Sequence, residues 1–140
     1  PSILALLDPT DVSGREAALQ ALGKLEPAAL AQHAAAVVAK LEDSEGWVRH
    51  AAVQTMGKLE PATLAQHADA IVAMLEDSDK IVRFGAVETL EKLEVAALAQ
   101  HAAVVRRVLD ASLKDPKYTA AYARRAAEKI LGKLQATAPQ

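Results

Sequence analysis

The stretch LEDSEGWVRHAAVQTMGKLE (residues 41–60) returns 34 residues later as LEDSDKIVRFGAVETLEKLE (residues 75–94). The stretch that overlaps its end also recurs, as KLEPAALAQH from Lys24, KLEPATLAQH from Lys58 and KLEVAALAQH from Lys92. A fixed period of this length indicates stacked supersecondary units. The repeat therefore decides the fold, and each copy is interpreted as one structural unit.

Each unit has the residue spacing of two helices separated by a polar break. In the first helix Pro27 suits the opening turn, and apolar residues follow at helical spacing. These are Leu30, Ala34, Val37, Val38 and Leu41. The break Glu42-Asp43-Ser44 supplies capping residues, and Ser44 and its counterpart Ser78 are predicted to be caps. The second helix is predicted to turn one face inward, formed by Val48, Ala51, Ala52, Thr55, Met56 and Leu59.

The same pattern extends to both ends of the chain and predicts about seven helices. Four second helices are marked by Arg15, Arg49, Arg83 and Arg124, and three first helices begin near Pro27, Pro61 and Val95. We expect one domain over residues 1–140. Its expected units are 1–25 (partial), 26–59, 60–93 and 94–134, with a tail at 135–140. The last unit holds an insertion, either a longer loop or extra helical turns, with a helix start predicted at Asp115-Pro116.

The two ends of this stack differ in polarity. Arg106 and Glu128 stand in the last unit where the inner units have valine, so we expect a polar cap there. The opening unit lacks most of its first helix and shows no such cap. We therefore expect the chain to be the C-terminal part of a longer array.

The repeated segments resemble HEAT and HEAT-like repeats of the PBS-lyase type. In such repeats the second helix reads Asp, then Val-Arg, then Ala and Leu-Gly, and the tetratricopeptide pattern, which shares the period, is absent here. The Leu-Gly pair that ends this motif in the family is changed here by Met56 in one unit and by Glu91 in the next. The resemblance implies an all-α, right-handed α-solenoid of stacked antiparallel helix pairs.

The resemblance also implies a structural ladder between neighbouring units. Matched by position, it consists of Asp43 and Asp77 with Arg49 and Arg83. Pro9 stands where the opening unit would carry the aspartate. Arg15 and Arg124 are therefore expected to lack an aspartate partner.

Composition excludes several classes of function. The chain has 140 residues, 51% of them hydrophobic, and no cysteine, so it has no disulfide, thiolate metal site or cysteine nucleophile. No stretch approaches the roughly 20 apolar residues of a membrane span, and the cytoplasm is the default expectation. The net charge of −2 divides into −7 for residues 1–101 and +5 for residues 102–140. Such a polarised chain can orient a charged partner.

The recurring histidines are the first candidates for a metal site. His33, His67 and His101 occupy equivalent positions, but stacked helices lie about 8 to 10 Å apart, too far for a shared zinc ion. No other ligand recurs beside them, so we expect a structural or surface role and no metal. No glycine-rich phosphate loop or strained serine turn is found. Some HEAT-like folds are enzymes, including bilin lyases and a metal-dependent hydroxylase, but the hydroxylase His-Glu pairs are missing. We therefore expect no enzyme activity, no catalytic residue and no cofactor.

The positions that differ between units are the candidate binding residues. They share i, i+3, i+7 spacing on the second helices, which by resemblance line the concave surface. The predicted groove consists of Trp47, His50, Gln54, Ile81, Phe84, Glu88, Tyr122, Arg125 and Lys129. The open alternative is that the large apolar members only fill gaps between helices. Exposed aromatic and arginine side chains favour a scaffold that binds another protein or peptide, within a larger chain or assembly.

Two other functions stay open at this point. One is a structural spacer or an engineered repeat scaffold, which the close identity of the units permits. The other is nucleic-acid binding through the basic end. Its candidate residues are Arg106, Arg107, Lys114, Lys117, Arg124, Arg125, Lys129 and Lys133. Because the rest of the chain is acidic, we expect neither nucleic acid nor membrane as a partner.

Overall fold

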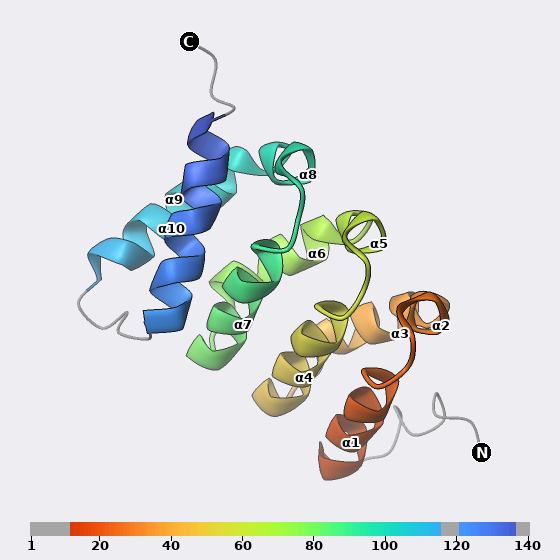
Figure 1. The fold of residues 1–140 in the computed structure, drawn as a ribbon. Coiled ribbons are helices and arrows are strands. Elements are labelled where there is room, and N and C mark those ends of the chain that lie inside the picture. Colours follow the sequence, from red (N-terminus) through yellow and green to blue (C-terminus); the bar gives the residue numbers. More distant parts are fainter. Residues whose placement is uncertain (1–11, 116–120, 137–140) are drawn as a thin grey trace.

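A computed structural model of the chain describes residues 12–115 and 121–136. Within these ranges it has ten α-helices, two short 3₁₀ helices and no strand. The second helices lie side by side in one row (Figure 1), formed by α1 (Val12–Leu22), α4 (Gly46–Met56), α7 (Lys80–Leu90) and α10 (Ala121–Ala136). The first helices form a second row behind it. This all-helical, two-row stack is the predicted fold.

Each first helix is divided into two pieces. The pieces are α2 (Pro27–Ala31) and α3 (Ala34–Ala39), α5 (Pro61–Ala65) and α6 (Ala68–Ala73), and α8 (Val95–Ala99) and α9 (Ala102–Lys114). The division falls at the recurring Gln-His pair, where His33 leaves the helical conformation at φ −110° and ψ 9°. Its amide donates to the Leu30 carbonyl at 2.9 Å, which closes the turn one residue early. Ten helices therefore replace the expected seven.

Carboxylates, and not the predicted serines, receive the amides where the second helices begin. After the 3₁₀ turns η2 (Lys40–Glu42) and η3 (Met74–Glu76), Asp43 Oδ1 accepts from the Glu45 amide at 3.0 Å. Asp77 Oδ1 accepts from the Asp79 amide at 2.9 Å, and Asp79 Oδ1 from the Ile81 amide at 2.9 Å. The prediction that Ser44 and Ser78 are caps is wrong, because an ionised carboxylate is the stronger acceptor.

One continuous apolar core lies between the two rows, and it extends from Ala18 to Leu134. Most residues predicted for both inward faces are in it, including Leu30 and Val37 of the first helix and Val48 and Met56 of the second, whereas Val38 is only half-buried. Along the second-helix row, α1 packs on α4, α4 on α7 and α7 on α10. Each unit therefore buries its apolar surface against its sequence neighbours, as in other solenoids.

The described part of the insertion in the last unit extends α9, which continues to Lys114. The helix start predicted at Asp115-Pro116 falls on Pro116, which lies outside the described residues. On the terminal helix α10, Glu128 is exposed at the position where Val53 and Val87 are buried in the inner units. The described residues include no helix that is long and apolar enough to cross a membrane.

Candidate functional site

Two bidentate ion pairs connect successive second helices. Arg15 Nε and Nη2 donate to the two Asp43 oxygens at 2.9 and 3.2 Å. Arg49 donates in the same way to Asp77, at 2.9 and 3.0 Å. Each arginine thus holds the aspartate 28 residues further on, in the following unit. The expectation that Arg15 lacks an aspartate partner is wrong, because the partner follows the arginine and the position of Pro9 does not matter.

The ladder stops at the other end of the row. Arg83 Nη1 donates to the Asp77 carbonyl at 2.7 Å, as Arg49 Nη1 does to the Asp43 carbonyl at 2.9 Å. The position 28 residues beyond Arg83 is Ala111, so Arg83 makes no cross-unit ion pair with any described residue. Arg124 Nη2 donates to the Leu113 carbonyl at 3.3 Å. Arg83 therefore makes its hydrogen bond to Asp77 within its own unit.

These contacts change the acidity of the groups involved. Burial acts to raise the pKa of Asp43, but the Glu45 amide and the Arg15 guanidinium outweigh it and lower the pKa. For Asp77, burial again acts to raise the pKa, but hydrogen bonds from Arg49 and from the Asp79 amide lower it. The hydrogen bond to Asp77 raises the pKa of Arg49. The ladder therefore consists of charged groups at neutral pH.

The predicted groove residues do not share one degree of exposure. Trp47 is 63% exposed and lies edge-on to His50, with ring centroids 6.4 Å apart. His50 and Ile81 are half-buried, whereas the exposed members are Gln54, Glu88, Arg125 and Lys129. Tyr122 belongs to α10, and its side chain lies outside the described part.

Phe84 does not contribute to an exposed aromatic strip. Its side chain is only 7% exposed and packs against Ala123 and Leu113 of the last unit. The open alternative, that large apolar residues fill gaps between helices, holds at this position. The reason is that α10 lies against α7 and covers it, which the sequence of one unit cannot show.

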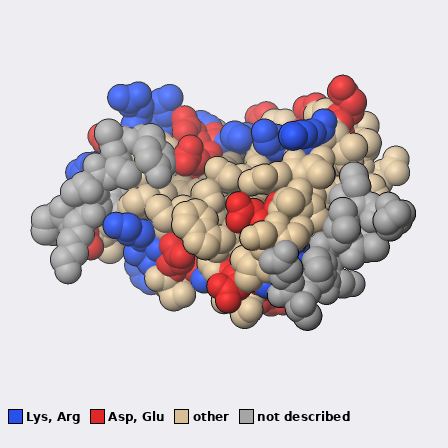
Figure 2. Space-filling view, turned by 90° about the horizontal axis from the view of Figure 1, so that it is seen from below, with Lys and Arg blue, Asp and Glu red and all other residues tan. Residues whose placement is uncertain are grey.

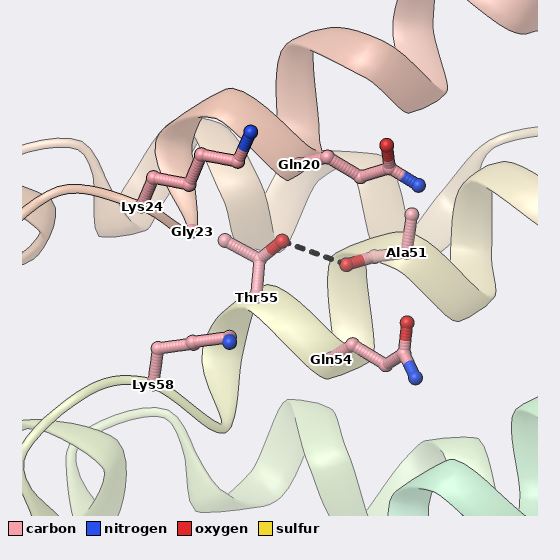
Figure 3. A pocket seen from close by; sticks show the side chains of 7 residues that line it. All are labelled: Gln20, Gly23, Lys24, Ala51, Gln54, Thr55 and Lys58. Atoms are coloured by element: carbon pink, nitrogen blue, oxygen red, sulfur yellow. Dashed lines mark hydrogen bonds between the residues drawn. The ribbon is translucent and has the colours of Figure 1, made fainter.

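Two hollows lie between the second helices, on the C-terminal halves of these helices. The α1–α4 hollow has a volume of about 280 Å³ (Figure 3), and its lining includes Gln20, Lys24, Gln54, Thr55 and Lys58. The α4–α7 hollow also measures about 280 Å³ and shares Gln54 and Lys58 with it. The floor of the first hollow is held by Thr55, whose hydroxyl donates to the Ala51 carbonyl at 2.8 Å and the Leu19 carbonyl at 3.0 Å.

A lysine lies just beyond α1, α4 and α7 and in the last turn of α10, and the groove predicted from the sequence does not include these residues. Lys92 Nζ donates to the Gly57 carbonyl of the preceding unit at 2.9 Å. Lys133 Nζ donates in the same way to the Glu91 carbonyl at 2.6 Å. Lys24 and Lys58 have no such partner among the described residues. The recurrence of Lys-Leu-Glu from Lys24, Lys58 and Lys92 is the sequence signal that marks three of these lysines.

Comparison with known proteins identifies the repeat. The family described as HEAT repeats matches residues 1–91 and again residues 34–132. This chain belongs to the HEAT repeat family. The crystal structure of an engineered protein, a target of the Northeast Structural Genomics Consortium, is similar with a TM-score of 0.75 and 18% identity. The match covers 94% of this chain and 60% of that chain, and at this identity it shows the fold alone. No curated protein matches.

The HEAT histidines stand at the bends of the first helices. His33, His67 and His101 each precede the second piece of a divided helix and are half-buried. Among the described residues, no group of three or more His, Cys, Asp or Glu side chains is placed to hold a metal ion. The geometry assigns these histidines to the bend.

Intramolecular contacts occupy much of the basic end of the HEAT array. Arg107 pairs with Glu76 and Lys129 with Glu91, both at 3.3 Å. Arg106 Nη2 donates to the Leu134 carbonyl at 3.0 Å. The ion pairs of Arg107 and Lys129 join the last unit to its neighbour, and the hydrogen bond of Arg106 joins α9 to α10 within the last unit. This arrangement weakens the case for a phosphate-binding surface.

Proposed function

We propose that this HEAT repeat chain is a non-catalytic scaffold that binds another polypeptide along its second-helix row. The observation that carries the proposal is Trp47, 63% exposed on the first turn of α4. Within the described part of the chain it is the one large hydrophobic side chain that is exposed. Tryptophan is among the residues that dominate affinity at protein interfaces.

The surroundings of Trp47 also suit a protein interface. His50 supports one edge of the indole, and Gln54 follows two turns further along α4, at the border of both hollows. An apolar anchor beside polar and charged groups matches the usual division of an interface into a core and a rim. Figure 2 shows that the molecule is hollowed along its upper edge, which is the second-helix side. This shape would receive a convex or extended partner.

The test compares the intact chain with Trp47→Ala. Proteins captured by the immobilised chain are identified, and the dissociation constant of the purified partner is measured by calorimetry. We expect Trp47→Ala to weaken binding by about 2 kcal/mol, the size of an interface hot spot. Its melting midpoint should stay close to that of the parent, because an exposed substitution changes stability by only about 0.5 kcal/mol.

Gln100→Ala is the matched control, since Gln100 is exposed on the first-helix row. It should leave the affinity unchanged. Phe84 is unsuitable as a test position, because removing a buried phenylalanine costs about 3 to 5 kcal/mol of stability. Equal affinity of the parent and Trp47→Ala would contradict the scaffold proposal.

The second candidate is a structural spacer or an engineered repeat scaffold with no partner of its own. The near-identity of the inner units and the similarity to an engineered protein favour it. The same capture experiment separates the two. A structural spacer predicts that the immobilised chain captures no protein whose binding depends on Trp47.

A further inference from the structure

Three lysines form a row across the ends of the second helices. Lys24, Lys58 and Lys92 are equivalent by the repeat and all exposed, and we call them the lysine row. Lys24 and Lys58 line the α1–α4 hollow, and Lys58 and Lys92 line the α4–α7 hollow. Because Lys58 belongs to both, the two hollows and the row form one continuous surface.

Two of the three ammonium groups have their donors available. Lys92 Nζ donates a hydrogen bond to the Gly57 carbonyl, whereas Lys24 and Lys58 have no hydrogen-bond or ion-pair partner among the described residues. An ammonium group carries three donors and no acceptor. In Figure 3 both lysines extend along the hollow with Gln20 and Gln54 beside them. The α1–α4 hollow thus offers cations and amides and no carboxylate.

The charge pattern favours separate carboxylates over a continuous polyanion. Lys and Arg side chains gather along the hollowed edge in Figure 2. Glu88 nevertheless lines the α4–α7 hollow, and Glu128 is exposed further along the row. A phosphate backbone, with a charge at every nucleotide, would meet these glutamates. A peptide can instead place neutral residues opposite them.

We propose that the lysine row binds an extended acidic segment of the partner, an inference that rests on the proposed function. Adjacent packed helices lie about 8 to 10 Å apart, so successive lysines of the row are about that far apart. A segment in the extended polyproline II conformation advances about 3.1 Å per residue and has about three residues per turn, so every third side chain lies on the same face. Acidic residues three positions apart would therefore reach successive lysines.

A fluorescein-labelled synthetic peptide of about twelve residues tests this. It carries glutamate at every third position in a serine and leucine background. Two reference peptides carry glutamine in place of glutamate, or the same glutamates in one block. In fluorescence anisotropy the spaced glutamate peptide should bind most tightly, and added salt should weaken it.

Substitutions of single lysines test whether the peptide binds at the lysine row. Lys24→Gln and Lys58→Gln should each weaken binding of the spaced peptide by about two- to fivefold, the range of exposed ion pairs. Lys114→Gln removes the same charge from the exposed end of α9 and should leave the affinity unchanged. Circular dichroism checks that all variants are folded.

The outcomes distinguish this inference from the proposed function. Equal binding of glutamate and glutamine peptides, with loss in Trp47→Ala, would overturn the acidic segment and keep the scaffold. No binding of any peptide would count against both. Tighter binding of a single-stranded oligothymidylate than of the spaced peptide would replace the peptide with nucleic acid.

Discussion

Gly46 shows how one missing side chain lets two units approach. A Cβ at Gly46 would overlap Asp79 Oδ2 of the next unit and lie 3.3 Å from its Cγ. Asp79 cannot turn aside without loss, because its other oxygen accepts the Ile81 amide at the start of α7. The glycine is therefore required by close packing and not by an unusual backbone angle. Gly132 on α10 is the contrast, with nothing within 4 Å of a Cβ there.

These two glycines give opposite predictions for the same substitution. Gly46→Ala should lower the free energy of unfolding by about 1 kcal/mol, since it displaces the Asp79 cap. Gly132→Ala should raise it by about 0.5 to 1 kcal/mol, because alanine is favoured inside an exposed helix. Urea unfolding of both variants measures the difference. Stabilisation by Gly46→Ala would show that Asp79 does not hold this position.

At the scale of elements, the arginine–aspartate pairs join α1 to the start of α4 and α4 to the start of α7. Their arginine and aspartate side chains are 7 to 14% exposed, so water screens them only in part. The aspartates have a lowered pKa in the folded chain. The unfolded chain then takes up protons first as the pH falls, which favours unfolding.

The stability contributed by the ladder should therefore depend on pH in one direction. It is fully present above the ordinary aspartate pKa of about 3.9 and is lost as the pH falls below that value through the lowered pKa of Asp43 and Asp77. Asp77→Asn should cost about 1.5 to 3 kcal/mol at neutral pH, the range for hydrogen bonds to charged groups. It should also flatten the acid limb of the stability curve.

Thermal unfolding between about pH 2 and pH 7 measures this dependence. Asp110→Asn, on an exposed position of α9, is the control and should keep the acid limb of the parent. An unchanged acid limb in Asp77→Asn would mean that other carboxylates cause the acid sensitivity.

At the scale of the whole molecule, the stability of each unit depends on the units packed against it. The inner helices α4 and α7 each pack against second helices on both sides. The five-residue helices α5 and α8 each bury a single residue, Leu64 and Leu98. Helices this short are marginal without tertiary contacts. The array should therefore open locally at the bends before its central row separates.

Amide hydrogen exchange tests this order. The amides of α4 and α7 should exchange slowest, through opening of the whole stack, and those of α5 and α8 markedly faster. Mass spectrometry of exchanged peptides resolves these segments. Equal protection of α5 and α4 would contradict local opening and indicate that the array unfolds as one unit.

The sequence could predict whatever depends on the period of a single unit. The burial of Leu30, Val37 and Val48 follows from helical spacing, because an inward face must recur every turn. The bend at His33 could not be predicted in this way, since the apolar spacing continues across it. The sequence placed the capping residues in the break Glu42-Asp43-Ser44, but it could not decide that Asp43 and not Ser44 is the acceptor at the helix start.

By itself, then, the sequence determined the repeat family and the two-row stack, because these follow from local periodicity and its recurrence. Only the tertiary structure decided which unit each side chain contacts. Arg15 binds the aspartate of the following unit, Phe84 is covered by α10, and Lys24 and Lys58 stay unpaired among the described residues while Lys92 is bonded. Such differences arise because equivalent residues in a stack have different neighbours, and their contacts depend on the adjacent unit.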